Sequence, residues 1–117
     1  MFNGIIFYQG KVKKIVKRRN GVNLFLYSQI NLSKKDLGSS ISCDGVCLTL
    51  TSCEQNTYEF YLSSETLLKS KFKKIKVGDK INIELSLKYG QRISGHICQG
   101  HVDTVGKVVS IKKSDKS

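Results

Sequence analysis

The chain has 117 residues, of which 39% are hydrophobic, so it is long enough to bury one core but too short for two complete domains. No amino-terminal apolar stretch is long enough for a signal peptide or a membrane span, and we therefore expect a cytoplasmic protein with no membrane association. The four cysteines, at positions 43, 47, 53 and 98, are then expected to be reduced thiols that fill the core, react or bind a metal.

The charge is strongly basic, with 20 Lys and Arg against 9 Asp and Glu and a net charge of +11. Such a balance raises the possibility of nucleic-acid binding. Seventeen of the 20 are lysines, however, and all but Lys88 are scattered over residues 11–19, 34–35, 69–80 and 107–116. Arginine is better suited to phosphate and base contacts. We therefore expect solvated lysines and no specific nucleic-acid partner.

Apolar or alternating runs rich in β-forming residues follow one another along the chain. They cover residues 5–16, 22–30, 40–43, 46–53, 57–62, 80–87 and 102–111. The turn-forming pairs between them are Asn20-Gly21, Asp44-Gly45, Gln55-Asn56 and Gly78-Asp79. Many short strands at this spacing predict an antiparallel sandwich or barrel. The only clear helix signal is short: Ser63 or Ser64 is the cap, and residues 65–69 follow with Glu65 near the positive end.

Residues 40–51 (SISCDGVCLTLT) predict a strand, a tight Asp-Gly turn and a second strand with two different faces. In the second strand the aliphatic side chains at 46, 48 and 50 point one way, and the thiol and hydroxyls at 47, 49 and 51 point the other. Small polar side chains suit a wall against which a flat polar ligand lies. A half-exposed structural strand shows the same alternation, so the pattern alone leaves both interpretations open.

Two short segments near the ends of the chain are similar. Residues 10–15 (GKVKKI) and 106–111 (GKVVSI) match at Gly, Lys, Val and Ile with an offset of 96 residues. Self-similarity at a fixed offset is typical of internal repeats. The match suggests that a second copy of the domain begins near Val102.

Both histidines lie in residues 94–101 (SGHICQGH). The spacing His-x-Cys-x-x-His raises the possibility of zinc, with Cys43 and Cys47 as the other half, but these two flank a tight turn and form no Cys-x-x-Cys knuckle, so we expect no metal. Attack by Cys47 with a histidine base is a second alternative, although no third, orienting residue is evident. Acid-base chemistry suits the histidines better, since their ordinary pKa is about 6.5 and the adjacent glycines allow close backbone approach to a ligand.

Five motifs, in this order and in register, resemble the amino-terminal half of riboflavin synthase of the α-type. They are residues 1–6 (MFNGII), 44–49 (DGVCLT), 65–67 (ETL), 77–79 (VGD) and 95–103 (GHICQGHVD). The resemblance implies an all-β fold, a six-stranded antiparallel Greek-key barrel with one short helix. It further implies that each subunit of the full enzyme contains two such barrels and that the subunits form trimers. It also implies a dismutation in which two molecules of 6,7-dimethyl-8-ribityllumazine give riboflavin and 5-amino-6-ribitylamino-uracil without a metal or organic cofactor.

The resemblance also assigns roles to residues of this chain. His101 is the expected proton-transfer group at the C7-methyl of the lumazine, with His96 as the weaker candidate, and Ser40 and Cys47 complete the expected catalytic set. The expected substrate-binding residues are Gly4, Ile5, Ile6, Val46, Cys47, Leu48, Thr49, Leu62, Ser63, Ser64, Glu65, Thr66, Gly100, His101 and Val102. The helix amino terminus is expected to offer free N–H groups to the pyrimidinedione oxygens.

The chain departs from the family pattern in two places. Ser94 stands where the family usually has a second Gly, and the second barrel is missing. We expect residues 1–98 to form the lumazine-binding barrel and residues 99–117 to be the start of a truncated second barrel, a linker or a tail. Such a chain is expected to bind lumazine or riboflavin as a homo-oligomer, in which a second copy covers the ligand face, and to be inactive or weakly active alone. A non-catalytic lumazine or flavin carrier is the alternative, and a barrel that stacks single-stranded bases on exposed aromatics is a third hypothesis.

Overall fold

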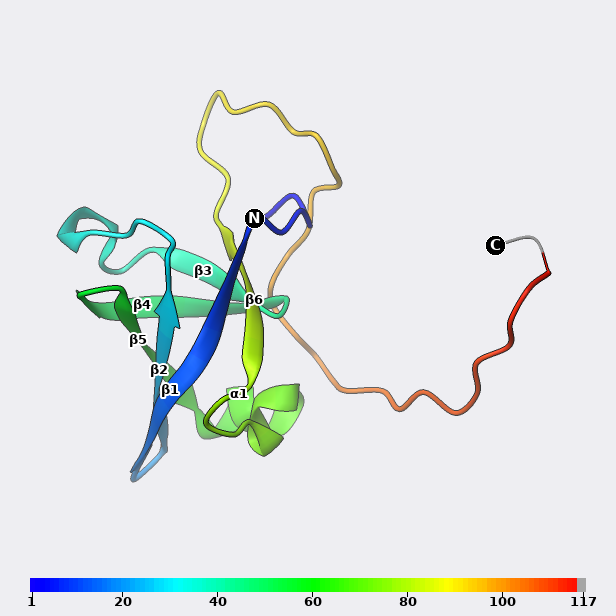
Figure 1. The fold of residues 1–117 in the computed structure, drawn as a ribbon, viewed down its shortest axis with the longest axis horizontal. Helices are drawn as coiled ribbons and strands as arrows, with labels where there is room; N and C mark the ends of the chain where they lie inside the picture. The colour runs from blue at the N-terminus through cyan, green and yellow to red at the C-terminus, as the bar shows by residue number, and fades with distance from the viewer. Residues whose placement is uncertain (116–117) are drawn as a thin grey trace.

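A computed structural model describes residues 1–115, and its six strands form a closed antiparallel barrel in the order β1-β2-β5-β4-β3-β6 (Figure 1). The strands are β1 (Tyr8–Arg18), β2 (Gly21–Ser28), β3 (Ser40–Cys43), β4 (Val46–Glu54), β5 (Thr57–Ser63) and β6 (Lys80–Leu85). Strands β3, β4 and β5 are joined by hairpins, and β2 lies beside β5 although a longer loop with a 3₁₀ turn, η1 (Lys34–Asp36), connects it to β3. This is the Greek-key arrangement, and the predicted fold class is confirmed.

Two of the hairpins are fixed by their turn residues. Asp44 and Gly45 have φ values of 47° and 83°, and Gln55 and Asn56 have values of 46° and 61°. Positive φ at both central residues of a two-residue loop matches the right-handed twist of the flanking strands. The Asp44-Gly45 turn therefore sets the register in which Cys43 pairs with Val46, and so decides which side chains of β4 point outward.

The barrel interior is filled by one cluster of aliphatic and aromatic side chains. Leu24, Leu62 and Ile81 are fully buried within it, and Val12 and Phe60 are almost fully buried. At one end of the barrel, α1 (Ser64–Lys69) and the 3₁₀ turn η2 (Lys71–Lys74) follow β5 (Figure 1).

The short helix begins where the sequence predicts. Ser63 is the N-cap, and its hydroxyl accepts the N–H of Thr66 at 3.2 Å. Ser70 then caps η2 in the same way, and this turn places Phe72 in the core, where it is almost completely buried. The capped helix and turn thus close one end of the barrel.

The predicted β-rich run at residues 102–111 forms no strand, so this prediction was wrong. After Val102, which packs against the core, the described chain runs away from the barrel with Val108, Val109 and Ile111 exposed (Figure 1). A strand needs a neighbouring edge to pair with, and a closed barrel offers none. The local sequence has the β pattern, but no partner strand is present to pair with it.

Two segments outside the barrel lie against each other. We call residues 1–7 the N-terminal segment and residues 95–102 the strap. Phe2 and Cys98 form an isolated antiparallel bridge, with N–H···O distances of 2.9 Å in both directions. The strap is thereby held beside the N-terminal segment, and it continues from there to the start of β4.

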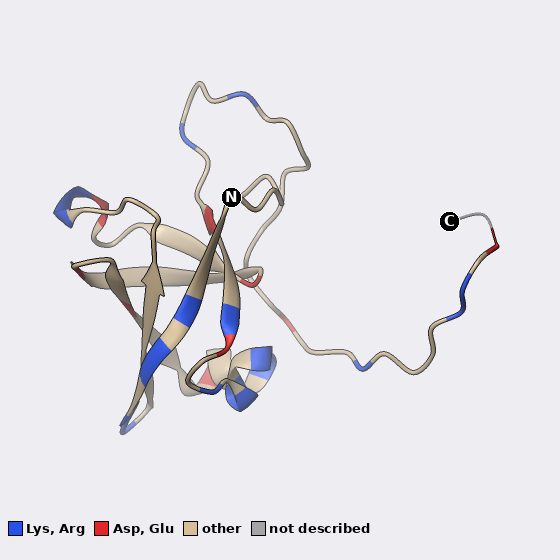
Figure 2. Cartoon of the chain, viewed as in Figure 1, with Lys and Arg blue, Asp and Glu red and all other residues tan. Residues whose placement is uncertain are grey.

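The basic residues lie on many parts of the molecule. Lys and Arg occur on β1, on the turn that follows it, on η1, near α1 and along the carboxy-terminal segment (Figure 2). In the described chain no helix is long and apolar enough to cross a membrane.

Candidate functional site

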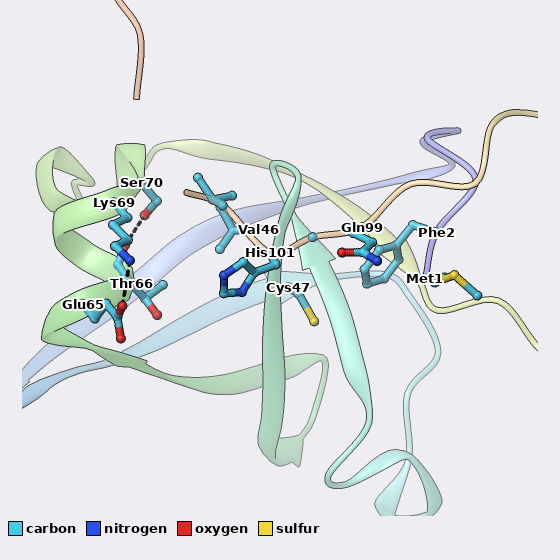
Figure 3. Close-up of a pocket in the computed structure, with 12 residues that line it drawn as sticks. Met1, Phe2, Val46, Cys47, Glu65, Thr66, Lys69, Ser70, Gln99 and His101 are labelled. Carbon is cyan, nitrogen blue, oxygen red and sulfur yellow. Dashed lines mark hydrogen bonds and ion pairs between the residues drawn. The ribbon is translucent and has the colours of Figure 1, made fainter. Parts of the chain in front are cut away.

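A pocket of about 410 Å³ lies between the start of β4, the helix α1 and the strap (Figure 3). Side chains and backbone from four separate parts of the chain line it. They are Met1, Phe2, Val46, Cys47, Glu65, Thr66, Lys69, Ser70, Gln99, Gly100, His101 and Val102. Its volume lies in the range of about 300–1,000 Å³ that is usual for small-molecule sites.

The barrel wall of this pocket is the first two residues of β4. Strand alternation turns Val46 into the core and leaves Cys47 exposed on the outer face, as the sequence predicts. The N–H of Cys47 donates to the carbonyl oxygen of Gly100 at 2.8 Å, so the strap is bonded directly to the barrel at this point.

Glycine is required at the contact between strap and barrel. A Cβ on Gly100 would lie 2.6 Å from the Cβ and 2.7 Å from the N of Cys47, closer than real side chains approach. A Cβ on Gly95 would lie 2.3 Å from the carbonyl oxygen of Asn3. In the structure these two glycines allow close approach to other parts of the protein, whereas the sequence suggested close approach to a ligand.

Charged and titratable groups gather at the helix side of the pocket. Lys69 Nζ lies 2.8 Å from Glu65 Oε1, and His101 Nε2 lies 3.6 Å from Asp103 Oδ1 (the first pair is drawn in Figure 3). The side-chain hydrogen bond and the charge of Lys69 lower the pKa of Glu65, with a smaller contribution from His101. Glu65 in turn raises the pKa of Lys69. The pocket therefore presents a carboxylate, an ammonium and an imidazole to a ligand with complementary polar edges.

The amino terminus of α1 is more occupied than the sequence suggests. The N–H of Ser64 donates to the carbonyl oxygen of Asn20 at 3.0 Å, and the N–H of Thr66 donates to Ser63 Oγ. These two donors already have partners in the protein. Side chains such as those of Thr66 and Lys69 add further hydrogen-bond donors at this end of the pocket.

Seven of the residues expected to bind substrate are brought together here, although they come from three distant stretches. They are Val46, Cys47, Glu65, Thr66, Gly100, His101 and Val102. Figure 3 shows the His101 ring between the α1 side chains and Cys47.

Other expected residues lie around this pocket without lining it. Leu48 and Leu62 are buried in the core. Ser63 caps α1, and Ser64 is exposed in its first turn. Ser40 of β3 pairs with Thr49 of β4, one row further along the outward face that carries Cys47.

The expected residues of the N-terminal segment lie on another side of the strap. The N–H of Gly4 is held by the carboxylate of Glu84, and Ile6 is exposed. Ile5 lines a second cavity of about 480 Å³ between the N-terminal segment and residues 83–91. The first two residues of this segment, Met1 and Phe2, line the first pocket.

Five lining residues were not expected from the sequence: Met1, Phe2, Lys69, Ser70 and Gln99. Lys69 follows Glu65 by four residues on one helix, and that spacing was a usable signal. Ser70 is buried and donates to the carbonyl oxygen of Thr66, which the sequence pattern does not reveal. Met1, Phe2 and Gln99 lie within the motifs at residues 1–6 and 95–103, which was a usable signal, but the contact between Phe2 and Cys98 that brings these motifs together is not indicated by any local pattern.

The geometry bears on the alternative chemistries considered for the cysteines. Across residues 1–115, no group of three or more His, Cys, Asp or Glu side chains is placed to hold a metal ion. Burial raises the pKa of the Cys43 thiol, which makes it a protonated core residue. Cys47 is exposed beside His101 in the pocket, whereas His96 lies elsewhere on the strap, with its N–H on the carbonyl oxygen of Asn3.

Both the family match and the sequence relatives of this chain point to lumazine-binding proteins. The sequence model of the family described as "Lumazine binding domain" matches residues 3–86. The chain is 40% identical over 114 residues to a riboflavin synthase of Buchnera aphidicola and 36% identical over 115 residues to one of Chlamydia pneumoniae. Each alignment covers 97% of this chain but only 53% and 58% of the relative, so the chain spans about half the length of these curated relatives.

Solved structures share the fold. LumP in complex with riboflavin superposes with a TM-score of 0.79 over 98% of this chain and 62% of that chain, at 22% identity. LumP in complex with 6,7-dimethyl-8-(1'-D-ribityl) lumazine gives a TM-score of 0.78 over 98% of this chain and 64% of that chain, also at 22% identity. At this level of identity the likeness establishes the architecture of the barrel.

Proposed function

The chain belongs to the lumazine binding domain family, and from that premise we propose that it binds 6,7-dimethyl-8-ribityllumazine in the pocket between β4, α1 and the strap. The single observation that supports this best is the pocket itself, which collects seven of the residues that the resemblance assigned to substrate from three distant stretches. Its size suits a small bicyclic ring with a polyol chain. Riboflavin, with the same ribityl chain, is the expected second ligand.

Each wall of the pocket has a role in this proposal. Val46 and Cys47 give a flat surface for the ring, while the hydroxyl of Thr66 and the Glu65–Lys69 pair hydrogen-bond the ribityl chain and the polar ring edge. Ser40 and Thr49 extend the polar face of the barrel wall beside Cys47. Gly4, Ile5 and Ile6 contact a ligand that extends beyond the strap, toward the second cavity.

We further propose that the chain supplies the amino-terminal half-site of a riboflavin synthase, in which residues 1–98 are the lumazine-binding barrel and residues 99–117 lead into a second barrel. The reaction brings two lumazines face to face, and binding both in fixed positions replaces an improbable encounter. The second lumazine then lies on the second barrel, into which residues 99–117 lead. This proposal agrees with the alignment to about half of each relative.

His101 is the proposed proton-transfer residue. Its imidazole is exposed at the pocket, beside Glu65 and Asp103, and an imidazole nitrogen can accept the C7-methyl proton and return it. A non-catalytic carrier is the alternative function, supported by the fold that this chain shares with LumP. A carrier needs no such group.

Binding is tested by fluorescence titration of the purified chain with the lumazine and with riboflavin, at low and high salt. We expect both affinities to survive added salt, because hydrogen bonds and stacking dominate them, whereas binding to an oligonucleotide would collapse as ions are added. Cys47→Leu places a larger side chain in the pocket and should weaken binding at least tenfold. Thr51→Leu is the control, because Thr51 lies further along the same face outside the pocket, and it should leave the affinity unchanged. No measurable binding by the wild type would refute the proposed function.

Catalysis is tested separately from binding. In heavy water, we expect the wild type to accelerate deuterium exchange at the C7-methyl of bound lumazine, and His101→Gln to lose this acceleration while it keeps most of the affinity. A carrier would bind the lumazine without accelerating the exchange. The 117-residue chain alone should form no riboflavin, and measurable formation would overturn the half-site proposal.

A further inference from the structure

Glu84 is a buried carboxylate that lines the second cavity and lies outside the pocket between β4, α1 and the strap. Strand alternation in β6 turns Ile81 and Ile83 into the core and puts Glu84 on the outer face of the barrel, yet only 8% of Glu84 is exposed. The N-terminal segment covers it. Among the ion pairs of residues 1–115, none involves Glu84, so no cation compensates the burial of this group.

Backbone N–H groups take the place of a cation. Glu84 Oε1 accepts the N–H of Asn3 at 2.6 Å and that of Gly4 at 3.1 Å, and Oε2 accepts the N–H of Gly4 at 3.2 Å. Two successive N–H groups thus point at one carboxylate, and the chain then turns at Gly4, whose φ of 74° is a left-handed conformation that favours glycine. Hydrogen bonds to an ionised acceptor are stronger than neutral ones, so this is a strong anchor for a segment that belongs to no strand.

The anchored segment carries the strap on its other side. Met1 accepts the N–H of Leu87 at 2.9 Å, Phe2 pairs with Cys98, and the carbonyl oxygen of Asn3 accepts the N–H of His96 at 3.2 Å. The strap then reaches β4 through Gly100. A continuous series of backbone contacts therefore runs from Glu84 to the pocket.

We propose that Glu84 is a positioning residue, whose buried carboxylate fixes the N-terminal segment. This segment holds the strap in the position in which Gly100 contacts Cys47 and His101 faces the pocket. Half of the twelve residues that line the pocket belong to these two segments, namely Met1, Phe2, Gln99, Gly100, His101 and Val102. Without the anchor the barrel keeps its own hydrogen bonds and core. The wall opposite α1 and β4 loses its fixed position.

The first test needs no ligand. Amide hydrogen exchange is compared in the wild type, Glu84→Ala, Glu84→Gln and Glu54→Ala, the last being a control that removes an exposed carboxylate at the far end of β4. In Glu84→Ala we expect protection of the amides of Asn3, Gly4, Cys98 and Cys47 to fall about tenfold or more, while core amides such as that of Leu26 keep theirs. The glutamine variant retains one oxygen acceptor and should recover part of the protection, and Glu54→Ala should match the wild type.

The second test rests on the proposed function. Lumazine affinity should fall about tenfold in Glu84→Ala, less in Glu84→Gln, and not at all in Glu54→Ala. If the wild type binds no lumazine, the proposed function fails, and the exchange experiment still decides on Glu84. If the wild type binds and Glu84→Ala binds as tightly with unchanged protection of the strap, the positioning role is refuted while the proposed function stands.

A general loss of stability is separated from the positioning role by the pattern of exchange. Equal loss of protection at the strap and at the core amides in both Glu84 variants would assign Glu84 to the stability of the whole barrel and refute the inference. Partial rescue by Glu84→Gln, confined to the strap and the N-terminal segment, supports it. The glutamine variant keeps the shape of the side chain, so the test does not depend on whether the alanine variant folds.

Discussion

Replacement of Gly100 by alanine should detach the strap from the barrel without unfolding the barrel. The added Cβ would lie 2.6 Å from Cys47 Cβ, and ordinary contact begins at 3.4 Å. The strap must therefore retreat by about 0.8 Å, which stretches the 2.8 Å hydrogen bond between Cys47 N–H and Gly100 to about 3.6 Å, beyond a useful length. Since Cys47 N and Cα crowd the same Cβ, no side-chain rotation relieves the clash.

The expected cost follows from these contacts. One lost backbone hydrogen bond is worth about 1 kcal/mol, and overpacking adds about 1–3 kcal/mol unless the strap moves away. Movement is the easier response, because the strap belongs to no strand. We expect the free energy of unfolding of the barrel to fall by about 1 kcal/mol and the lumazine affinity to fall about tenfold, as His101 moves with the strap.

Gly106→Ala is the matched control, since a Cβ at Gly106 meets nothing within 4 Å. Urea unfolding gives the stability of both variants, and fluorescence titration gives their affinity for the lumazine. Equal affinity in Gly100→Ala and Gly106→Ala, with both as stable as the wild type, would refute the close contact between Gly100 and Cys47 as the structure describes it.

Three further predictions concern single side chains. A thiol reagent should label the exposed Cys47 within the folded protein and reach the buried Cys43 only on unfolding, and bound lumazine should slow the labelling of Cys47. Burial raises the pKa of Cys43 above its ordinary value of 9.0, so the unfolded chain loses this proton first as the pH rises. The free energy of unfolding should therefore fall above pH 9.0 more steeply in the wild type than in Cys43→Ala, with a difference in slope of about 1.4 kcal/mol per pH unit. Urea unfolding under reducing conditions measures both slopes. Asp44→Ala removes the carboxylate that accepts the Asn82 N–H at 2.7 Å and Lys71 Nζ at 2.6 Å. It should lower the free energy of unfolding by about 2–3 kcal/mol in the same assay. Asp44→Asn should cost less, because asparagine tolerates the positive φ at this position.

The elements that the sequence predicts well are those set by local rules. The Asp44-Gly45 and Gln55-Asn56 turns, the cap at Ser63 and the two faces of β4 each depend on residues within a few positions of one another, and all are confirmed. Closure of the barrel follows from the number and spacing of strands together with the family resemblance. The prediction of a strand at residues 102–111 is wrong for a related reason. The local pattern is that of a strand, but strand formation depends on a partner edge.

The parts of the site that sequence reasoning missed depend on contacts between distant residues. Glu84 accepts a hydrogen bond from Asn3, 81 positions away in the sequence. Phe2 pairs with Cys98, and all six strands of the barrel lie between these two residues in the sequence. Glu84 follows Lys80 and Asn82 on the polar face of an alternating β run, a pattern that suggests an exposed position, and only the N-terminal segment folded over it makes it buried. The sequence indicated which stretches supply the pocket, and the tertiary contacts decide which residues of those stretches line it.

The two kinds of wall differ in rigidity, and this bears on how a ligand would be held. The β4 side belongs to a closed barrel with a packed core, whereas the strap and the N-terminal segment are joined by a few backbone hydrogen bonds worth ~0.5–1.5 kcal/mol each. Opening of the strap therefore costs only a few kcal/mol, far less than unfolding of the barrel. A ligand that contacts both walls adds its own interactions to this weak closure, so binding should protect the amides of Cys98 and Cys47 from exchange more than those of the core. The anchor at Glu84 limits how far the strap opens, and this is why a residue outside the pocket between β4, α1 and the strap should still influence affinity.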